Sequence, residues 1–313
     1  MKKILLPLLI LFIIFCTCIY ILIPGEIRIS DISKAGCIPK NIVDCLARQS
    51  VINRWWPEKQ AEKQDSLFFY KGYAYKLTTI FTDGAEIQIG KGSKKLASRI
   101  RIIPVGKDSC VTEWQTSVAS GSNPFKRIGQ YYEASDLKNN MREVLSNLLS
   151  FAGKTENIYG FHIERTTFTD TVLFATRFSS GTYPSIETIY DHINDLRKKI
   201  KEADTKEKDF PMLNVNQTDS MKYETMIAIC VNKEIAGDKN YFVSRMVPMK
   251  DRFLKTTVTG GDLTIQKAHE AIEHYMNDHF LSAPAIPFEI LVTDRSKETD
   301  TSKWKTIIFY PSM

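Results

Sequence analysis

An internal repeat in the second half of the chain limits the possible folds more than any other feature. The stretch RFSSGTYPSIETIYDHINDL (residues 177–196) aligns with TVTGGDLTIQKAHEAIEHYM (residues 257–276), an offset of 80 residues. Each stretch reads as the end of a strand, a glycine turn and a helix with a comparable spacing of apolar residues. This half of the chain therefore contains two copies of one structural unit.

The segments that follow the two helices also correspond. Residues 210–231 (FPMLNVNQTDSMKYETMIAICV) and residues 286–311 (IPFEILVTDRSKETDTSKWKTIIFYP) each read as a strand, a polar loop and a second strand. Each copy is thus strand, strand, helix, strand, strand, which is too small to bury its own sheet face well. We expect the two βαββ-type copies to pair about a pseudo-twofold axis and to form a cleft where they meet.

Four short motifs follow one another towards the C-terminus. They are KAHEAI (residues 267–272), PFEIL (287–291), DTSKW (300–304) and YP (310–311). In this order they resemble the GyrI-like effector-binding family, which is also found as the ligand domain of AraC-type and MerR-type transcription activators. The resemblance covers about Tyr159 to Met313, assigns residues 157–313 to a GyrI-like domain, and implies binding of small, often apolar or cationic molecules in the central cleft.

Glu289 is the first candidate for the binding site. A carboxylate buried without a partner in this half-apolar strand is costly, so Glu289 is expected to be exposed, paired, or in contact with a cationic or hydrogen-bonding ligand. The resemblance implies that Glu289 is the buried acid that meets the ligand, and Leu213 replaces it in the first copy. The chain departs from the family at Leu291, where tyrosine is common, so aromatic stacking from that position is lost.

Three aromatic residues complete the predicted site. Tyr183 lies where the first copy turns into its helix, and it either contributes to the cleft, as the resemblance implies, or packs at the start of the helix. Trp304 and Tyr310 share one face of the last strand with Thr306 and Ile308, where they line the cleft or belong to the core. The predicted ligand-binding residues are Glu289, Tyr183, Trp304 and Tyr310.

The first half of the chain shows a different order of elements. Residues 26–156 read as a strand, a helix, several strands and a long helix that is expected from Ser135, an N-cap candidate. This order, with the RWWP of residues 54–57, resembles the START-like (SRPBCC) helix-grip family, in which a curved antiparallel sheet wraps a C-terminal helix. The resemblance implies an apolar cavity. Its possible lining residues, which alternatively form a plain core, are Trp55, Phe69, Tyr73, Tyr75 and Trp114.

The N-terminus carries a long apolar run. Residues 4–23 (ILLPLLILFIIFCTCIYILI) include no charged side chain, and at about 1.5 Å per residue they match the roughly 30 Å hydrocarbon core of a bilayer. No small residues of a signal-peptide cleavage site follow the run, so it predicts an uncleaved transmembrane anchor over residues 1–25. Lys2 and Lys3 favour a cytoplasmic N-terminus, with both domains outside the cytoplasm.

The cysteines and histidines show neither a disulfide framework nor a metal-ligand spacing. Cys37 and Cys45 would bridge in an oxidising compartment, or they are two buried thiols. His269 and His274 are five residues apart, which places them about 140° apart around a helix, too far to share a metal ion. We therefore expect neither a metal nor a cofactor.

The distribution of charge argues against a nucleic-acid partner. The net charge is +6, with 42 basic residues scattered among 36 acidic ones, and no DNA-binding motif stands out. No nucleophile elbow and no phosphate-binding loop is present, so an enzyme is not favoured. The sequence predicts a membrane-anchored α+β protein that binds small molecules. The alternatives are a glutamate-dependent hydrolase of reactive small molecules and an interaction scaffold with collapsed cavities.

Overall fold

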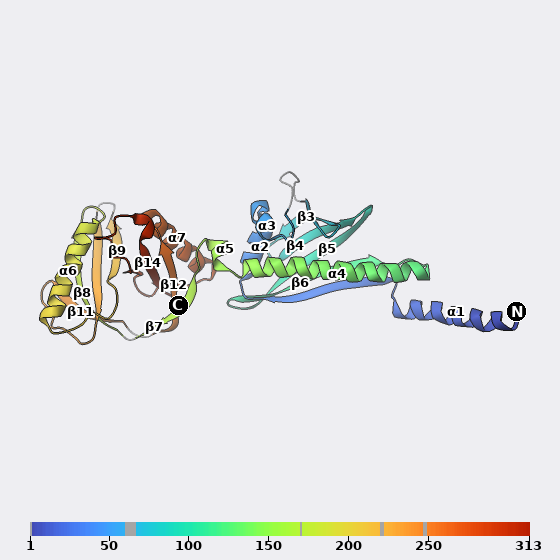
Figure 1. The fold of residues 1–313 in the computed structure, drawn as a ribbon, viewed down its shortest axis with the longest axis horizontal. Coiled ribbons are helices and arrows are strands. Elements are labelled where there is room, and N and C mark those ends of the chain that lie inside the picture. Colours follow the sequence, from blue (N-terminus) through green and yellow to red (C-terminus); the bar gives the residue numbers. More distant parts are fainter. Residues whose placement is uncertain (1, 60–66, 170, 220–221, 247–248) are drawn as a thin grey trace. The chain divides into compact units, whose positions relative to one another are not determined.

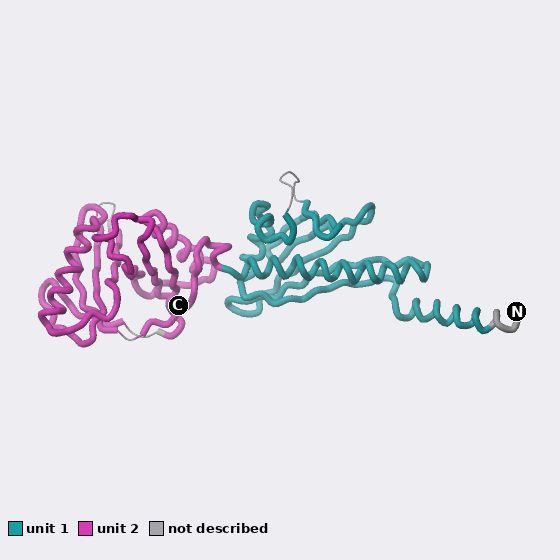
Figure 2. Tube along the Cα trace, in the orientation of Figure 1, with its two compact units in different colours: residues 1–154 teal, residues 155–313 magenta. Residues whose placement is uncertain are grey.

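The computed structural model describes residues 2–59, 67–169, 171–219, 222–246 and 249–313. The chain forms two units, unit 1 (Met1–Lys154) and unit 2 (Thr155–Met313), which Figure 2 shows in different colours. Each unit is built from helices and one antiparallel sheet. The predicted α+β class is confirmed.

Unit 1 contains a six-stranded sheet with the strand order β1-β6-β5-β4-β3-β2. Figure 1 shows the long helix α4 (Pro124–Ala152) alongside this sheet. Its strands are β1 (Glu26–Ala35), β2 (Leu67–Tyr70), β3 (Tyr73–Phe81), β4 (Gly84–Lys91), β5 (Lys94–Gly106) and β6 (Ser109–Ala119). Its helices are α1 (Lys2–Leu22), α2 (Pro39–Ala47), α3 (Gln49–Trp55) and α4 (Pro124–Ala152). The long helix α4 lies against β1 and β6, which agrees with the expected helix-grip arrangement.

Two elements that the sequence presents as continuous are divided. The helical stretch of residues 41–56 breaks at Arg48, whose extended backbone (φ −114°, ψ 113°) separates α2 from α3. Residues 67–81 form the hairpin of β2 and β3, because Lys71 and Gly72 both have positive φ (45° and 79°), as a tight two-residue turn requires. Single backbone conformations, which the apolar pattern does not encode, set both breaks.

Helix α4 begins well before Ser135. The side chain of Asn123 caps it by accepting hydrogen bonds from the backbone N–H groups of Phe125 and Lys126 at 2.9 and 3.2 Å. The first buried residue of the helix is Ala134, so the apolar pattern starts where the helix becomes covered. The start predicted at Ser135 is wrong because this pattern reports burial, whereas the cap determines where the helix begins.

The aromatic residues proposed to line a cavity in unit 1 mostly form its core. Tyr75 and Trp114 are fully buried, with ring centroids 6.0 Å apart, and Trp55 and Tyr73 are buried as well. Phe69 lies apart from them and is 44% exposed. A cavity of about 20 Å³ between α4 and the sheet has room for about one water molecule. The alternative of a plain core therefore describes this interior.

The buried cysteines of unit 1 are free thiols. Cys37, Cys45 and Cys110 all lie in its core without a disulfide. Burial raises the pKa of the Cys45 thiol to about 12. A hydrogen bond with Cys110, together with burial, raises the pKa of the Cys37 thiol. Of the two alternatives for Cys37 and Cys45, the structure has the buried thiols.

Helix α1 forms over the N-terminal apolar run, and apolar side chains such as Leu11 and Ile14 are exposed on it. Near its C-terminal end, Arg127 of α4 donates a hydrogen bond to the Ile23 carbonyl oxygen at 2.9 Å and stacks over the Tyr20 ring at 4.4 Å. Within the part of the chain that the structure describes, no helix is both long enough and apolar enough to cross a membrane. The transmembrane assignment is thus not supported.

Unit 2 contains an eight-stranded sheet with the strand order β11-β8-β10-β9-β13-β14-β12-β7. The first copy comprises β7 (Glu164–Phe168), β8 (Thr171–Ser180), α6 (Ile186–Glu202), β9 (Met212–Asp219) and β10 (Lys222–Val231). The second comprises β11 (Tyr241–Met246), β12 (Met249–Thr259), α7 (Asp262–Asp278), β13 (Phe288–Leu291) and β14 (Lys305–Pro311). The short helices α5 (Thr155–Tyr159) and η1 (Thr301–Lys303) complete the unit.

The strand order of unit 2 is symmetric about the β9–β13 pair. From this pair the sheet runs outward as β9-β10-β8-β11 on one side and as β13-β14-β12-β7 on the other. The first strand of each copy changes sides, because β7 pairs with β12 and β11 pairs with β8. This order agrees with the duplicated, pseudo-twofold GyrI-like architecture that the sequence resembles.

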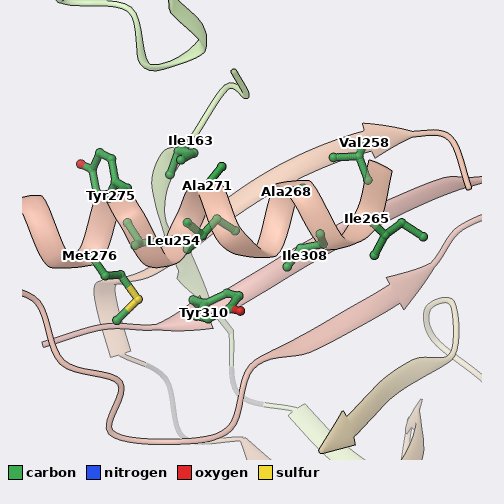
Figure 3. Packing of buried hydrophobic residues seen from close by; sticks show 11 residues of the cluster. Ile163, Leu254, Val258, Ile265, Ala268, Ala271, Tyr275, Met276, Ile308 and Tyr310 are labelled. Carbon is green, nitrogen blue, oxygen red and sulfur yellow. The ribbon is translucent and has the colours of Figure 1, made fainter. Parts of the chain in front are cut away.

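The two long helices of unit 2 cover the same face of its sheet. Helix α6 packs on an apolar cluster that includes Leu213 and Ile229, and α7 packs on another that includes Ile308 (Figure 3). Successive side chains of a strand point to opposite faces, so Phe253 and Phe309 belong to a third apolar cluster on the other face. Both faces of the sheet are therefore largely apolar, and a polar group on either face stands out.

Candidate functional site

A cleft of about 720 Å³ lies on the helix-covered face of unit 2, where β9, β13 and β14 approach α7. Leu213 and Glu289 contribute to it from the centre of the sheet. Helix α7 contributes Ile265, His269 and Glu273, which are four residues apart and therefore share one side of the helix. The volume is in the range of small-molecule sites, roughly 300–1,000 Å³.

Glu289 lies at the centre of this cleft with its side chain 12% exposed. Its Oε2 accepts a hydrogen bond from Arg295 Nη2 at 3.2 Å, and its Oε1 lies 3.4 Å from His269 Nε2. Of the possibilities that the sequence leaves open, the carboxylate is thus both largely buried and paired. The pairing offsets much of the cost of taking its charge out of water.

Arg295 is the cation that faces Glu289, and its side chain is 6% exposed. Its Nη2 also donates to Thr306 Oγ1 at 2.8 Å, and its guanidinium stacks over the Trp304 ring at 5.0 Å. Its backbone N–H donates to the hydroxyl of Tyr190, on α6 of the first copy, at 2.7 Å. Contacts from both copies therefore hold Arg295 beside the carboxylate.

A chain of polar contacts continues from Glu289 along α7. His269 Nδ1 lies 2.9 Å from Tyr310 Oη, which donates to Glu273 Oε1 at 3.2 Å. Burial, followed by the charge of Glu273, raises the pKa of Tyr310, so this hydroxyl keeps its proton. Because the Tyr310 hydroxyl directs its proton at Glu273, its oxygen accepts from His269 Nδ1, and a neutral His269 then has no second N–H to donate to Glu289. A donor group of a ligand can supply the hydrogen bond that Glu289 lacks on this side.

Tyr183 borders the cleft from the loop between β8 and α6, and it is 53% exposed. Its ring makes an edge contact with Tyr223 of β10, with 5.9 Å between the ring centroids. Loss of water around the hydroxyl, followed by the negative charge of Glu289, raises the pKa of Tyr183 to about 12. The two rings provide an uncharged aromatic rim.

Three of the four predicted binding residues lie together at this cleft: Glu289, Tyr183 and Tyr310. Trp304 is 3% exposed and lies beneath Arg295, so that it supports the cleft from behind. Leu291, where the family commonly has tyrosine, packs into the core under α6.

The sequence did not predict three other cleft residues, His269, Glu273 and Arg295. The repeat contains a signal for His269, because Ile189 stands at its position in the first copy at the offset of 80 residues. Arg295 lies in the loop after β13, where no periodic pattern places a side chain.

The charged lining of the cleft is net negative. Asp262, Glu273 and Glu289 supply three carboxylates against the single guanidinium of Arg295, when His269 is neutral. Such a lining favours a cation over an anion. Among the described residues, no group of three or more His, Cys, Asp or Glu side chains is arranged to hold a metal ion.

Comparisons with known proteins yield similar folds at low sequence identity. The C-terminal domain of EcmrR is 12% identical, with 49% of this chain and 98% of that chain covered and a TM-score of 0.42. A hydrolase from Listeria innocua is 11% identical, with coverage of 48% and 91% and a TM-score of 0.37. The Aha1 dimer from Colwellia psychrerythraea is 13% identical, with coverage of 41% and 98% and a TM-score of 0.31. No protein-family model and no curated protein matches the chain.

Proposed function

We propose that unit 2 binds a small cationic molecule in the cleft around Glu289 and releases it unchanged. The observation that carries this proposal is the largely buried carboxylate of Glu289 in an open cleft whose charged lining is net negative. A buried ion pair is weak evidence for stability, since well-packed apolar residues often serve the fold as well. Contact with a cationic ligand accounts for a charged residue at position 289, which packing alone does not require.

Thermal unfolding of the full chain with tetraethylammonium or benzyltrimethylammonium tests the proposal. We expect either cation to raise the melting temperature, and Glu289→Gln to abolish the rise. Glu207→Gln is the matched control, because Glu207 also accepts hydrogen bonds from an arginine, Arg197, at 3.0 Å but lies away from the cleft. No rise with any cation, or an equal rise in Glu289→Gln, would contradict the proposal.

A second candidate is hydrolysis of a reactive small molecule. The specific observation is His269, which lies between the Glu289 carboxylate and the Tyr310 hydroxyl at 3.4 and 2.9 Å. A carboxylate and an imidazole in contact can remove a proton from a water molecule that attacks a substrate. Turnover of activated esters or epoxides that is lost in both His269→Gln and Glu289→Gln would favour this candidate over binding alone.

For unit 1 we propose a scaffold role, because aromatic side chains fill the interior in which a helix-grip protein would hold a ligand. Trp114 is fully buried there and its Nε1 donates to Ser98 Oγ at 3.0 Å, so that its fluorescence reports on this interior. Probes with an apolar tail, such as decanoate, should leave the wild-type minus Trp114→Phe difference spectrum unchanged. A change in that spectrum would favour a ligand cavity.

We also propose that α1 attaches the chain to a membrane. Residues 4–23 carry no charge, and apolar side chains of α1 such as Leu11 and Ile14 are exposed. Lys2 and Lys3 favour an orientation with both units outside the cytoplasm. Alkaline carbonate should leave the chain in the membrane pellet, and protease added to intact cells should cleave the two units. Release by carbonate would contradict the attachment.

A further inference from the structure

A second cavity of about 410 Å³ lies on the sheet face of unit 2 that α6 and α7 do not cover. Met212, Phe253 and Phe288 of the third apolar cluster line it, and Met226 and Met246 add two further methionines. Methionine side chains are flexible and polarizable, so they adapt to apolar groups of different shapes. We call this cavity the methionine pocket.

The methionine pocket offers little to a charged ligand group. Arg245 is the charged residue of its described lining, and its Nε donates to Glu234 Oε1 at 2.9 Å. Its polar lining residues otherwise are Ser244 and Asn214. Since a charge transferred into such surroundings is left without compensation, the pocket suits an apolar group.

The methionine pocket and the cleft on the other face share part of their lining. Both are lined by Leu213, Asn214, Ile286 and Phe288. The strands β9 and β13 that separate them pair over two residues only, Leu213 and Met212 on the β9 side. Immediately beyond this short pairing, the side chain of Asn214 donates from Nδ2 to the Pro287 carbonyl oxygen at 2.8 Å. One side-chain hydrogen bond therefore spans the boundary between the two compartments.

We propose that the cleft and the methionine pocket are two compartments of one site for a single-chain alkylammonium amphiphile. The ammonium head lies near Glu289, and the alkyl tail passes Asn214 and lies among Met212 and Met226. The assignment of a cationic head rests on the function proposed above. The assignment of the tail to the methionine pocket rests on the lining residues that the two cavities share.

The test measures how affinity depends on tail length. Alkyltrimethylammonium ions with ethyl, butyl, hexyl and octyl tails, each ending in a photoreactive diazirine, are irradiated with the full chain, and labelled peptides are quantified by mass spectrometry. Affinity should rise roughly fourfold with each buried methylene group. The adducts of the longer probes should lie on the strands that carry Met212 and Met226. Labelling of α1 measures nonspecific partition of the same probes.

A matched pair of variants at Met226 locates the tail. Met226→Trp fills the methionine pocket and should remove the dependence on tail length, while the ethyl probe still binds. Met226→Ala leaves the space open and should keep that dependence. Affinity that does not change with tail length, with adducts confined to Tyr183 and Tyr223, would overturn this inference and leave the proposed function intact. If no probe binds, including the ethyl one, the proposed function itself fails.

Discussion

Glu289 and Leu213 face each other as register partners in the strand pair β9–β13, and they also occupy equivalent positions in the two copies of unit 2. The pseudo-twofold axis therefore passes between a carboxylate and an apolar side chain. The equivalence extends to β14 and β10, the strands that pair with β13 and β9. Tyr310 lies two residues beyond the register partner of Glu289, and Ile229 lies two residues beyond that of Leu213, so these two residues correspond.

The polar cluster of the second copy thus takes the place of an apolar cluster in the first. His269, Glu289 and Tyr310 make successive polar contacts at the cleft. Their equivalents Ile189, Leu213 and Ile229 all belong to the core beneath α6. The first copy shows that the fold accepts apolar residues at these positions, so the polar residues of the second copy call for a reason other than folding.

Removal of Arg295 should destabilise unit 2 strongly. Arg295→Met leaves the Glu289 carboxylate largely buried without its cation, and breaking a buried pair in this way costs about 3–5 kcal/mol. Urea unfolding followed by the fluorescence of Trp304, the tryptophan of unit 2, measures the loss. Arg197→Met, which removes a more exposed arginine paired with Glu207, should cost about 1 kcal/mol or less. Equal losses in the two variants would contradict the assigned role of Arg295.

Replacement of Arg295, Glu289 and His269 together should restore the lost stability and abolish binding. A variant with Arg295→Met, Glu289→Leu and His269→Ile replaces the ion pair by apolar residues, and at positions 289 and 269 it carries the residue types of the first copy. Exchange of a buried ion pair for packed apolar residues is often neutral or stabilising by about 1–4 kcal/mol. We expect this variant to unfold at a urea concentration no lower than the wild type and to give no thermal shift with cations. A variant less stable than Arg295→Met alone would refute the argument from symmetry.

The hydroxyl of Tyr183 should make unit 2 sensitive to alkaline pH. Its pKa in the folded chain, about 12, lies above its ordinary value of 10, so folding favours the protonated form. The stability from this group is complete below pH 10 and is lost as the pH rises towards 12. The urea midpoint should therefore fall less between about pH 8 and about pH 11 in Tyr183→Phe than in the wild type.

The neighbouring ring provides the control for that measurement. Tyr223→Phe keeps the edge contact with Tyr183 and removes a different hydroxyl. An identical alkaline loss of stability in the wild type and Tyr183→Phe would show that Tyr183 does not cause it.

The Tyr75 hydroxyl should be dispensable for unit 1. Tyr75 is fully buried, and its hydroxyl has no hydrogen-bond partner among the described residues. Tyr75→Phe removes this unpaired polar atom, so we expect a change between zero and a gain of about 1 kcal/mol in the free energy of unfolding. Trp114→Phe breaks the bond to Ser98 Oγ and leaves a void, so it should destabilise by about 2 kcal/mol or more. A large loss in Tyr75→Phe would point to a polar partner in this core.

The N-terminal cap of α4 should be located at Asn123. Asn123→Ala removes the acceptor for two backbone N–H groups and should cost about 1 kcal/mol. Ser135→Ala changes an exposed residue inside the helix and should stay within about 0.5 kcal/mol of the wild type. Hydrogen exchange over residues 124–134 should accelerate in Asn123→Ala only. The reverse ranking of the two variants would place the start of the helix at Ser135.

The sequence predicts the features of this fold that depend on repetition and apolar periodicity. The two copies of unit 2 and the long helix of unit 1 produce such patterns, because many residues bury one face together. Glu289 was predictable because it interrupts an apolar strand pattern, and the equivalent strand of the first copy has no such interruption.

Other features depend on single residues, and a pattern does not record them. Arg48 and Lys71 break a helix and a strand through their own backbone angles. Arg295 reaches Glu289 from a loop, so its position follows from contacts with Tyr190 and Thr306 that are distant in sequence. Each copy has the same local sequence pattern whether β7 and β11 pair within their own copy or with the other copy. The pattern therefore does not reveal the exchange.

That exchange of strands has a consequence for the assembly of the fold. A chain with one copy alone would leave its first strand unpaired, because β7 of the first copy pairs with β12 of the second, and β11 of the second copy pairs with β8 of the first. A protein with a single copy would therefore pair its first strand in this way only as a homodimer that exchanges the two first strands. Because unit 2 holds both copies in one chain, the two sides of the axis can differ, and here one side has an apolar core while the other carries the Glu289 charge.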